Sequence, residues 1–513
     1  MDYSKAIGMN PKYNTFDLSH DKKLSLKMGE IIPVMAMDVL PGDKFTVESS
    51  HLTRMLPLLS PVMHNVKVKM RYFFSPNRLV WDNWEDFITG PESATDVTEP
   101  THPTMIGTPT PSSLLDYMGI STADGIGGQQ VEFNALPFAH YQFIWNEYFR
   151  DQNLQQEVNY QLTDGHNPNA DLFQKRKVAW QHDRFTSALP FTQKGPEVTL
   201  PVVQPGGRID LSFDPIGNRN KIHDPVNGST INGGNYVTTN SQGLTTFSGL
   251  QATFDITASN YLNASDLNIQ AATINELREA MAIQKWLELN ARTGNRYTEH
   301  IQAHFGVKPQ DARLQRPEEF GGSVANLQFS EVLQTSESTQ DSALGQIGGH
   351  GITAAGSRKA SYYAQEHGWV FAFMYIVPDT TYSQGIPAKF SKTDRYDYYQ
   401  PLLAHIGEQP VKQRELYATG GAGDDNTFGY LPIYDEYRHE ENTVHGLMKS
   451  SLEYWHMGRK FANAPALNAS FIQCDPTDRI FVEQNQAEQV IAHVYNDLKV
   501  QRKVPYYGTP MGL

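Results

Sequence analysis

Histidine, cysteine and carboxylate side chains occur at several places where their spacing can be compared with known metal-binding and catalytic patterns. His439 and His445 lie six positions apart in YRHEENTVH, whereas a His-Glu-x-x-His zinc site needs two imidazoles one helical turn apart. Cys474 is followed by Asp-Pro, a turn signal whose carboxylate would raise the pKa of the thiol and disfavour a nucleophilic thiolate. Two adjacent aspartates lie in GGAGDDN, which is typical of a turn. We therefore expect no catalytic residues, no metal site and no enzyme activity.

A second candidate for chemistry is the segment GITAAGSRK (351–359), which has the glycine spacing of a phosphate-binding loop. That loop also needs a lysine followed by serine or threonine, and it joins a strand to a helix. Here Ser-Arg follows the second glycine, and the surrounding sequence does not predict a strand and a helix. We expect no nucleotide and no other cofactor.

Six basic residues form the densest basic strand faces of the sequence: Lys67, Lys69, Arg71, Lys499, Arg502 and Lys503. Such faces can contact phosphates without regard to base sequence and with strong salt dependence. Alternatively, they are solvated or form ion pairs with neighbouring residues. The net charge of −14 excludes a protein whose whole surface binds nucleic acid, so these residues are candidates for local contact only.

The aromatic stretch RYFFSPNRLVWDNWEDFITG (71–90) could stack sugars or bases, or it could pack in a core. Trp81, Trp84 and Ile88 fall on one side of a short predicted helix, and three carboxylates fall on the other. A stacking platform would expose its rings and flank them with amides. We therefore predict structural packing for these three residues, and also for Trp286 in a longer helix predicted over 273–294.

These candidate residues are carried by a chain whose composition is typical of a loop-rich β protein. Charged residues make up 19% and aromatic residues 11% of the 513 residues, with 30 prolines and 39 glycines. One cysteine excludes an intrachain disulfide and fits a reducing compartment. The N-terminal segment has no apolar signal-peptide core, and no apolar run approaches the length of a membrane span.

Alternating apolar and polar residues predict the strands of this β protein. Val66, Val68, Met70 and Tyr72 alternate with basic residues and predict a half-buried strand. The same period-two pattern runs through 490–504, whereas the continuous apolar run in 368–379 predicts a strand buried on both faces. A strand–turn–strand unit is predicted over 31–50, and helices are predicted over 138–153 and 273–294.

Residues 205–265 differ from the rest of the chain because they are rich in Gly, Asn, Ser and Thr. They contain too few apolar residues to form a core of their own. We predict that they are a variable surface insertion in a single domain of residues 1–513. Connections of this length need a reason in a compact protein, and burial against neighbouring copies is one.

Five long segments of unusual composition occur in this order along the chain: NRLVWDNWEDFITG, LPFAHYQFIWNEYFRDQNLQ, HDRFTSALPFTQKGPEVTLPV, GNRYTEHIQAHFGVKPQDARLQRPEEFGG and HGWVFAFMYIVPDTTYSQGI. These segments resemble the major capsid protein of the microviruses, which are small icosahedral single-stranded DNA bacteriophages, and in particular that of their gokushovirus branch. From the first to the last, they span residues 77–386, which is most of the chain, and none of them lies in 205–265.

The resemblance implies an eight-stranded antiparallel jelly roll with long inserted loops and a few helices. It further implies a T=1 shell of sixty copies around a circular single-stranded DNA genome, with pentameric assembly intermediates. The insertion would lie at the three-fold axis and touch a host cell-surface receptor. Implied partners are a small basic DNA-binding peptide and the scaffolding and pilot proteins of the virion. The protein would belong to the virion, be assembled in the bacterial cytoplasm and insert in no membrane.

Two other functions are compatible with a β-rich chain of this kind. A lectin-like jelly roll could bind carbohydrate, and a receptor-binding spike or adhesin could use the insertion as its binding face. A lectin of this kind would be secreted and monomeric or a small oligomer, and an adhesin would be a trimer. The size of the purified particle separates these alternatives from a shell.

Overall fold

The structure is a computed structural model that describes residues 12–90, 99–121, 129–196, 198, 274–294, 296–333, 347–484 and 488–507. Between 199 and 273 it describes only the backbone of five short strands. Residues 1–194 and 288–513 form one compact unit, and residues 195–287 form a second. The basic residues and Trp81, Trp84 and Ile88 belong to the first unit, and Trp286 belongs to the second.

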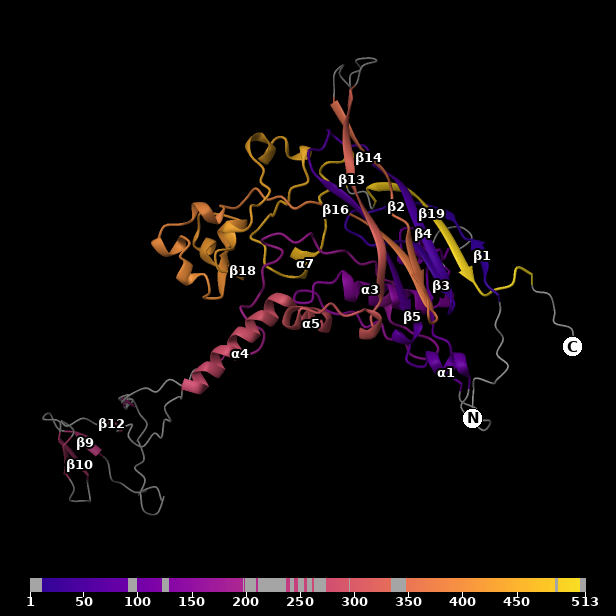
Figure 1. The fold of residues 1–513 in the computed structure, drawn as a ribbon. Coiled ribbons are helices and arrows are strands. Elements are labelled where there is room, and N and C mark those ends of the chain that lie inside the picture. Colours follow the sequence, from indigo (N-terminus) through magenta and orange to yellow (C-terminus); the bar gives the residue numbers. More distant parts are fainter. Residues whose placement is uncertain are drawn as a thin grey trace. The chain divides into compact units, whose positions relative to one another are not determined.

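Ten strands of the first unit form one antiparallel sheet in the order β1-β19-β4-β14-β13-β5-β16-β3, with β15 beside β4 and β2 beside β19 (Figure 1). Eight strands are long: β2 (His20–Leu26), β3 (Ile32–Val39), β4 (Lys44–Met55), β5 (Val66–Pro76), β13 (Glu318–Leu333), β14 (Ile347–Gly356), β16 (Gly368–Pro378) and β19 (Val490–Arg502). Two have four residues each, β1 (Asn14–Asp17) and β15 (Ala360–Tyr363). The predicted jelly roll of eight strands is therefore confirmed, with two short strands added.

The sheet divides into two facing halves at β13. Residues Glu318–Leu327 of β13 pair with β5, and Gln328–Leu333 pair with β14. One continuous hydrophobic core collects side chains from β3, β5 and β16 on one side and from β2, β4 and β19 on the other. Closing two sheets over one core is the physical basis of a jelly roll, because each sheet then buries one apolar face.

Strand periodicity explains how each half contributes to this core. The predicted apolar positions of β5 are all at most 1% exposed, and they alternate with half-exposed basic residues. In β19 the core positions are Val490, Ala492, Val494, Leu498 and Val500, as predicted. Successive side chains of a strand point to opposite faces, so the basic residues between them point away from the core.

Strand β16 is buried on both faces because a second layer covers its outer side. The jelly-roll core contains Val370, Ala372, Met374 and Ile376. A second core contains the residues between and after them, Phe371, Phe373, Tyr375 and Val377. The helix α3 (Leu136–Tyr148) supplies much of that second core. The rings of Tyr141 and Phe373 meet with their centroids 5.7 Å apart. The prediction of a strand without a solvent-facing side is confirmed.

The aromatic stretch after β5 is partly buried in this second layer. Trp81 is 1% exposed, and its indole N–H donates to Asp164 Oδ1 at 2.8 Å. Trp84 is half-buried and lies edge-on to Trp81. The packing predicted for Ile88 is wrong: helix α1 (Trp84–Thr89) begins three residues after Trp81, and Ile88 is 48% exposed on its outer side.

Helix α4 (Ile274–Thr293) ends where the sequence predicts, at Gly294, whose φ of +102° suits glycine. Its predicted apolar arc is mostly exposed, and Ala291 is its only buried residue. Trp286 is 50% exposed in one copy of the chain, and the packing predicted for it stays a prediction. Among the described residues, no helix combines the length and the apolar character that crossing a membrane requires.

Shorter elements connect the strands of the first unit. They are β6 (Thr104–Gly107), α2 (Leu114–Met118), β7 (Val131–Asn134), α5 (Tyr297–Phe305), β17 (Glu408–Lys412), α6 (Gln413–Leu416), β18 (Thr427–Pro432) and α7 (Ala469–Ile472). The second unit contains β8 (Ile209–Asp210), β9 (Val237–Thr239), β10 (Leu244–Phe247), β11 (Thr253–Asp255) and β12 (Tyr261–Leu262). Apart from these strands, the predicted insertion 205–265 lies outside the described residues.

Candidate functional site

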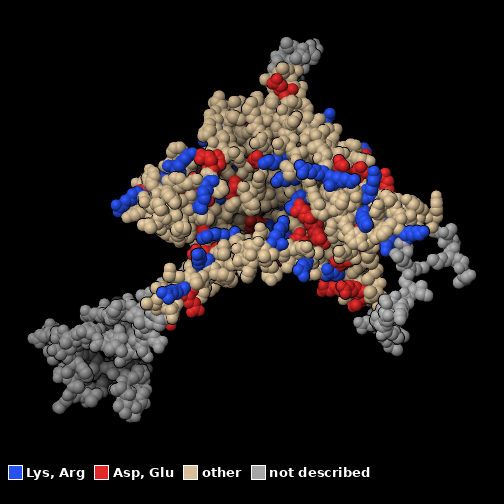
Figure 2. All heavy atoms as spheres, viewed as in Figure 1, with Lys and Arg blue, Asp and Glu red and all other residues tan. Residues whose placement is uncertain are grey.

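The six predicted basic residues do not form one surface. Lys67, Lys69 and Arg71 lie on the outer face of β5, and Lys499 lies on the outer face of β19. The jelly-roll core lies between these two faces, because the alternate residues of both strands belong to it. Figure 2 shows basic and acidic side chains interspersed over the face in view.

Three of the six basic residues form ion pairs within the chain. For these three, the structure favours a role in ion pairs with neighbouring residues over contact with phosphates. Lys67 Nζ lies 2.7 Å from Asp379 Oδ1. Arg71 Nε donates to Glu319 Oε1 at 2.6 Å, and Arg502 Nη2 lies 2.6 Å from the buried carboxylate of Asp43. A charge that is already paired gains less from a phosphate, because binding must replace the existing partner.

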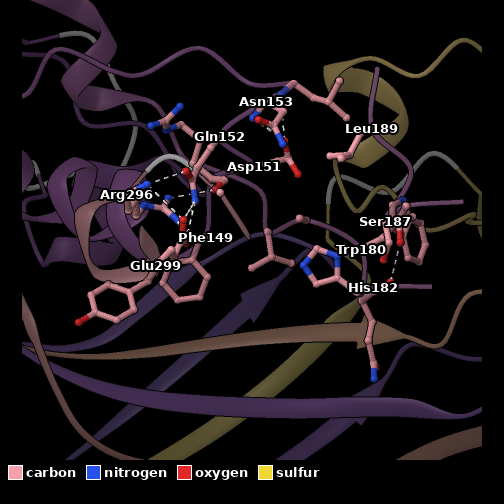
Figure 3. Close-up of a pocket in the computed structure, with 18 of the residues that line it drawn as sticks. Phe149, Asp151, Gln152, Asn153, Trp180, His182, Ser187, Leu189, Arg296 and Glu299 are labelled. Carbon is pink, nitrogen blue, oxygen red and sulfur yellow. Dashed lines mark hydrogen bonds and ion pairs between the residues drawn. The ribbon is translucent and has the colours of Figure 1, made fainter. Parts of the chain in front are cut away.

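Lys69 and Arg71 line a cavity of about 560 Å³ on the outer face of β5. Its walls come from the end of α3, the segment 178–189 and the start of α5. Figure 3 shows Gln152, Arg296 and Glu299 pointing toward one another. Gln152 Nε2 donates to both oxygens of Glu299 at 2.7 Å, and Arg296 Nη1 lies 3.3 Å from Glu299 Oε1. Burial lowers the pKa of Lys69, and two further cations of the cavity, Arg71 and Arg296, are paired with Glu319 and Glu299.

A second groove, of about 530 Å³, is lined by three lysines, Lys44, Lys359 and Lys499. We call it the lysine groove. Its other lining residues are Thr15, Phe45, Thr46, Ser361, Tyr362, Tyr363 and Gln501. In the described part of the chain, none of the three lysines has a carboxylate within ion-pair distance.

Strand register builds the lysine groove from four different segments. Lys44 of β4 stands between Tyr363 of β15 and Gln501 of β19. Two residues along β4, on the same face, Thr46 stands between Ser361 and Lys499. Cross-strand neighbours lie about 5 Å apart, so residues that are far apart in sequence share one surface. Asp17 of β1 pairs opposite Lys499 and marks the acidic border of the groove.

Aromatic rings lie among these cations. Lys44 Nζ is 5.4 Å from the ring centre of Tyr13 and 5.9 Å from that of Tyr363, and Lys503 Nζ is 5.3 Å from Tyr13. Both tyrosines are more than 40% exposed. Lysines for the backbone and exposed rings for the bases are the combination that single-stranded nucleic acids bind. Sequence reasoning found Lys499 and Lys503 but missed Lys44, Lys359 and both tyrosines, because only strand register brings them together.

The other sequence candidates occupy structural positions. Cys474 is fully buried, and burial raises the pKa of its thiol. The glycines of GITAAGSRK up to Gly356 lie on β14, a strand and not a loop. His439 Nε2 lies 3.6 Å from Asp435 Oδ1, whereas His445 contacts Thr443, so the two imidazoles have different partners. Among the described residues, no group of three His, Cys, Asp or Glu side chains is arranged to hold a metal ion.

Large apolar side chains are exposed on at least three separate parts of the first unit. They lie on α5 (Tyr297, Phe305), on β13 and β14 (Val324, Val332, Leu333, Ile347) and in the segment 386–406 (Ile386, Phe390, Tyr396, Tyr398, Tyr399, Leu402, Ile406). Single exposed apolar residues are normal, but clusters of this kind mark surfaces that another molecule covers.

Comparison with known proteins identifies a family. Residues 8–512 match the family model described as "Capsid protein (F protein)". The chain is 35% identical to "Capsid protein VP1" of Bdellovibrio phage phiMH2K and 32% identical to "Capsid protein VP1" of Chlamydia phage 1. It is 30% identical to the protein of the same name from Spiroplasma virus 4. Each alignment covers 99% of this chain and 97% of the relative.

Proposed function

The chain belongs to the phage capsid protein (F protein) family and is a major capsid protein of the virion, and from this premise we propose that sixty copies form a T=1 shell around circular single-stranded DNA. The observation that carries the proposal is the apolar surface exposed at three separate places on one unit. A closed shell covers several surfaces of each subunit at once. Each contact can then be modest, because every subunit is bound by several neighbours.

The lysine groove supports contact between the shell and its genome. Sixty chains at −14 carry about −840 charges, the same sign as DNA. Packaging therefore needs local cation clusters together with a small basic peptide or counterions. The three lysines have no ion-pair partner among the described residues, in contrast to Lys67, Arg71 and Arg502. We therefore assign the contact with phosphates to the lysine groove, and we no longer assign it to Lys67, Arg71 and Arg502.

Replacing Lys44, Lys359 and Lys499 together with glutamine is expected to weaken binding of single-stranded DNA to purified subunits. Each lost phosphate contact reduces the slope of log K against log salt by about 0.7, so the slope should fall by about 2. Fluorescence anisotropy across a salt series measures this slope. The exposed Lys449, changed to glutamine, is the matched control. If the triple variant and the control bind with the same slope, the assignment to the groove fails.

We further propose that the insertion 205–265 contributes to host attachment. Deleting residues 217–262 should leave particle formation intact, because these residues lie in the second compact unit, outside the jelly roll. Adsorption of the deleted particles to host cells is expected to be lost. Adsorption at the wild-type rate would remove this part of the proposal.

A further inference from the structure

A small third core supports the C-terminal part of the first unit. It collects Phe185, Val411, Leu416, Phe428 and Phe471, with further residues from the strand β18 and from α7. We call the structure around it, residues 379–475 with the segment 183–189, the lobe. Most of the connections between β16 and β19 lie in it. The lobe therefore has a core separate from that of the jelly roll.

Arg184 is buried in this lobe among three carboxylates. Its side chain is 2% exposed, and Nη1 lies 2.6 Å from Glu415 Oε2 and 3.2 Å from Glu441 Oε1. Its Nε lies 3.4 Å from Asp435 Oδ2. Burial alone would lower the pKa of Arg184, but the carboxylates raise it overall, led by Glu415. One cation thus joins three segments of the lobe.

The turn Asp435–Tyr437 connects this buried arginine to the surface. Asp435 points inward to Arg184, while Glu436 Oε1 lies 3.0 Å from Lys392 Nζ. The preceding Tyr434 has φ of +62° although it is not glycine, and it is 5% exposed. A buried aromatic residue in the left-handed region costs of order 1 kcal/mol and persists only where its surroundings hold it. The turn is therefore fixed from both sides.

Backbone groups of the segment 390–406 donate hydrogen bonds to the tyrosines at this turn. The N–H of Tyr399 donates to Tyr437 Oη at 3.4 Å, and the N–H of Gln400 donates to Tyr434 Oη at 3.2 Å. The ammonium of Lys392 lies 3.7 Å from the ring centre of Tyr437. These contacts hold the segment 390–406 in place, although the apolar side chains of this segment face solvent.

The segment 390–406 and Tyr437 together present an apolar surface that we call the tyrosine surface. Its members are Phe390, Tyr396, Tyr398, Tyr399, Leu402, Ile406 and Tyr437, each more than half exposed. Leu402 is 92% exposed. A fully buried aromatic side chain covers 150–250 Å², so these seven expose roughly 700 Å². This is close to the ~800 Å² that one partner contributes to a stable protein–protein interface.

The charges around the tyrosine surface indicate what covers it. Residues 389–397 and 436–440 together contain four basic and four acidic side chains. A polyanion or an anionic membrane would need an excess of basic residues, whereas a balanced rim around an aromatic centre is typical of protein–protein contact. In a shell built from many copies of one chain, the protein present at every such surface is another copy.

We propose that the tyrosine surface binds a second copy of the chain, and that Arg184 positions it through the turn Asp435–Tyr437. The inference rests on the proposed shell and names one of its contacts. Arg184 would act at a distance, since it is buried and the second copy would touch only the side chains that the turn presents.

The test compares Leu402→Asp with Leu402→Met in the full chain. Because Leu402 is almost fully exposed, neither change should alter the circular dichroism or the melting temperature of free subunits. The Asp variant is expected to lower the yield of particles at least tenfold, because a carboxylate would have to lose its water in the contact. The Met variant should assemble as the wild type does, because it keeps the apolar contact.

Hydrogen exchange gives a second readout on the wild-type protein. Amides of 390–406 should exchange more slowly in particles than in free subunits. Normal assembly of the Asp variant, or equal exchange in the two states, would overturn the proposal while leaving the shell intact. Particles that form normally but lose a different virion protein would overturn it too. Wild-type chains that never assemble would instead refute the proposed function.

Discussion

Replacing Arg184 with methionine is expected to lower the free energy of unfolding of the lobe by about 3–5 kcal/mol. Removing one member of a buried charged cluster leaves its partners without compensation, and this costs far more than the intact cluster contributes. Here three carboxylates would remain, and the side chains of Glu415 and Asp435 are each 7% exposed. Methionine fills a similar volume, so the effect comes from charge and not from a cavity.

Urea unfolding of free subunits, followed by tyrosine and tryptophan fluorescence, measures this loss. Arg313→Met is the matched control, because Arg313 is exposed and its loss should change stability by less than ~0.5 kcal/mol. The free energy of unfolding of Arg184→Lys should lie between those of these two variants, because lysine keeps the charge but not the forked geometry of arginine. Equal unfolding midpoints for the Arg184→Met and Arg313→Met variants would show that the carboxylates do not depend on Arg184.

Acid is expected to destabilise the protein through His140, which lies in α3 between the two layers. The imidazole is fully buried, with Nδ1 2.8 Å from Ser75 Oγ and Nε2 3.0 Å from Asn77 Oδ1. Burial lowers the pKa of His140 to about 3. Because the folded state then binds a proton less readily than the unfolded state, the neutral form stabilises the fold above pH ~6.5.

This stabilisation is lost as the pH falls from ~6.5 toward 3, at about 1.4 kcal/mol per pH unit. Between pH 6.5 and 4.5 the loss is about 2.3 kcal/mol, because half of the unfolded-state imidazoles are already protonated at pH 6.5. His140→Gln keeps one donor and one acceptor but cannot titrate, so its unfolding midpoint should depend less steeply on pH. Other buried histidines and the carboxylates affect both proteins equally and cancel in the comparison. Parallel midpoint curves for wild type and variant would contradict the role of His140.

Period-two alternation and the long apolar run predicted the jelly roll well. The basic side chains of β5 alternate with core residues over Val66 to Tyr72, and β16 is buried on both faces. These patterns are reliable because burial acts on every residue of a strand at once. Ile88 was mispredicted because a single apolar residue on a short helix does not determine what covers it, and the packing of Trp286 on a peripheral helix stays a prediction. Both are about half exposed in one copy of the chain.

The candidate sites were less accessible to prediction because they depend on contacts between distant segments. The sequence shows Lys67 and Arg71 as free basic residues, but Asp379 and Glu319 neutralise them from more than 240 positions away. The lysine groove needs the register of β1, β4, β15 and β19. The Arg184 cluster joins residues from 184 to 441. No local spacing encodes such contacts.

The central claim is that one chain buries its exposed apolar surfaces against identical copies in a closed container. The mass and symmetry of the purified assembly, measured by electron cryo-microscopy and charge-detection mass spectrometry, test it most directly. Sixty copies of a 57.7 kDa chain predict an icosahedral T=1 sphere with about 3.5 MDa of protein. A well-folded monomer or a trimer that persists under all assembly conditions would contradict the claim.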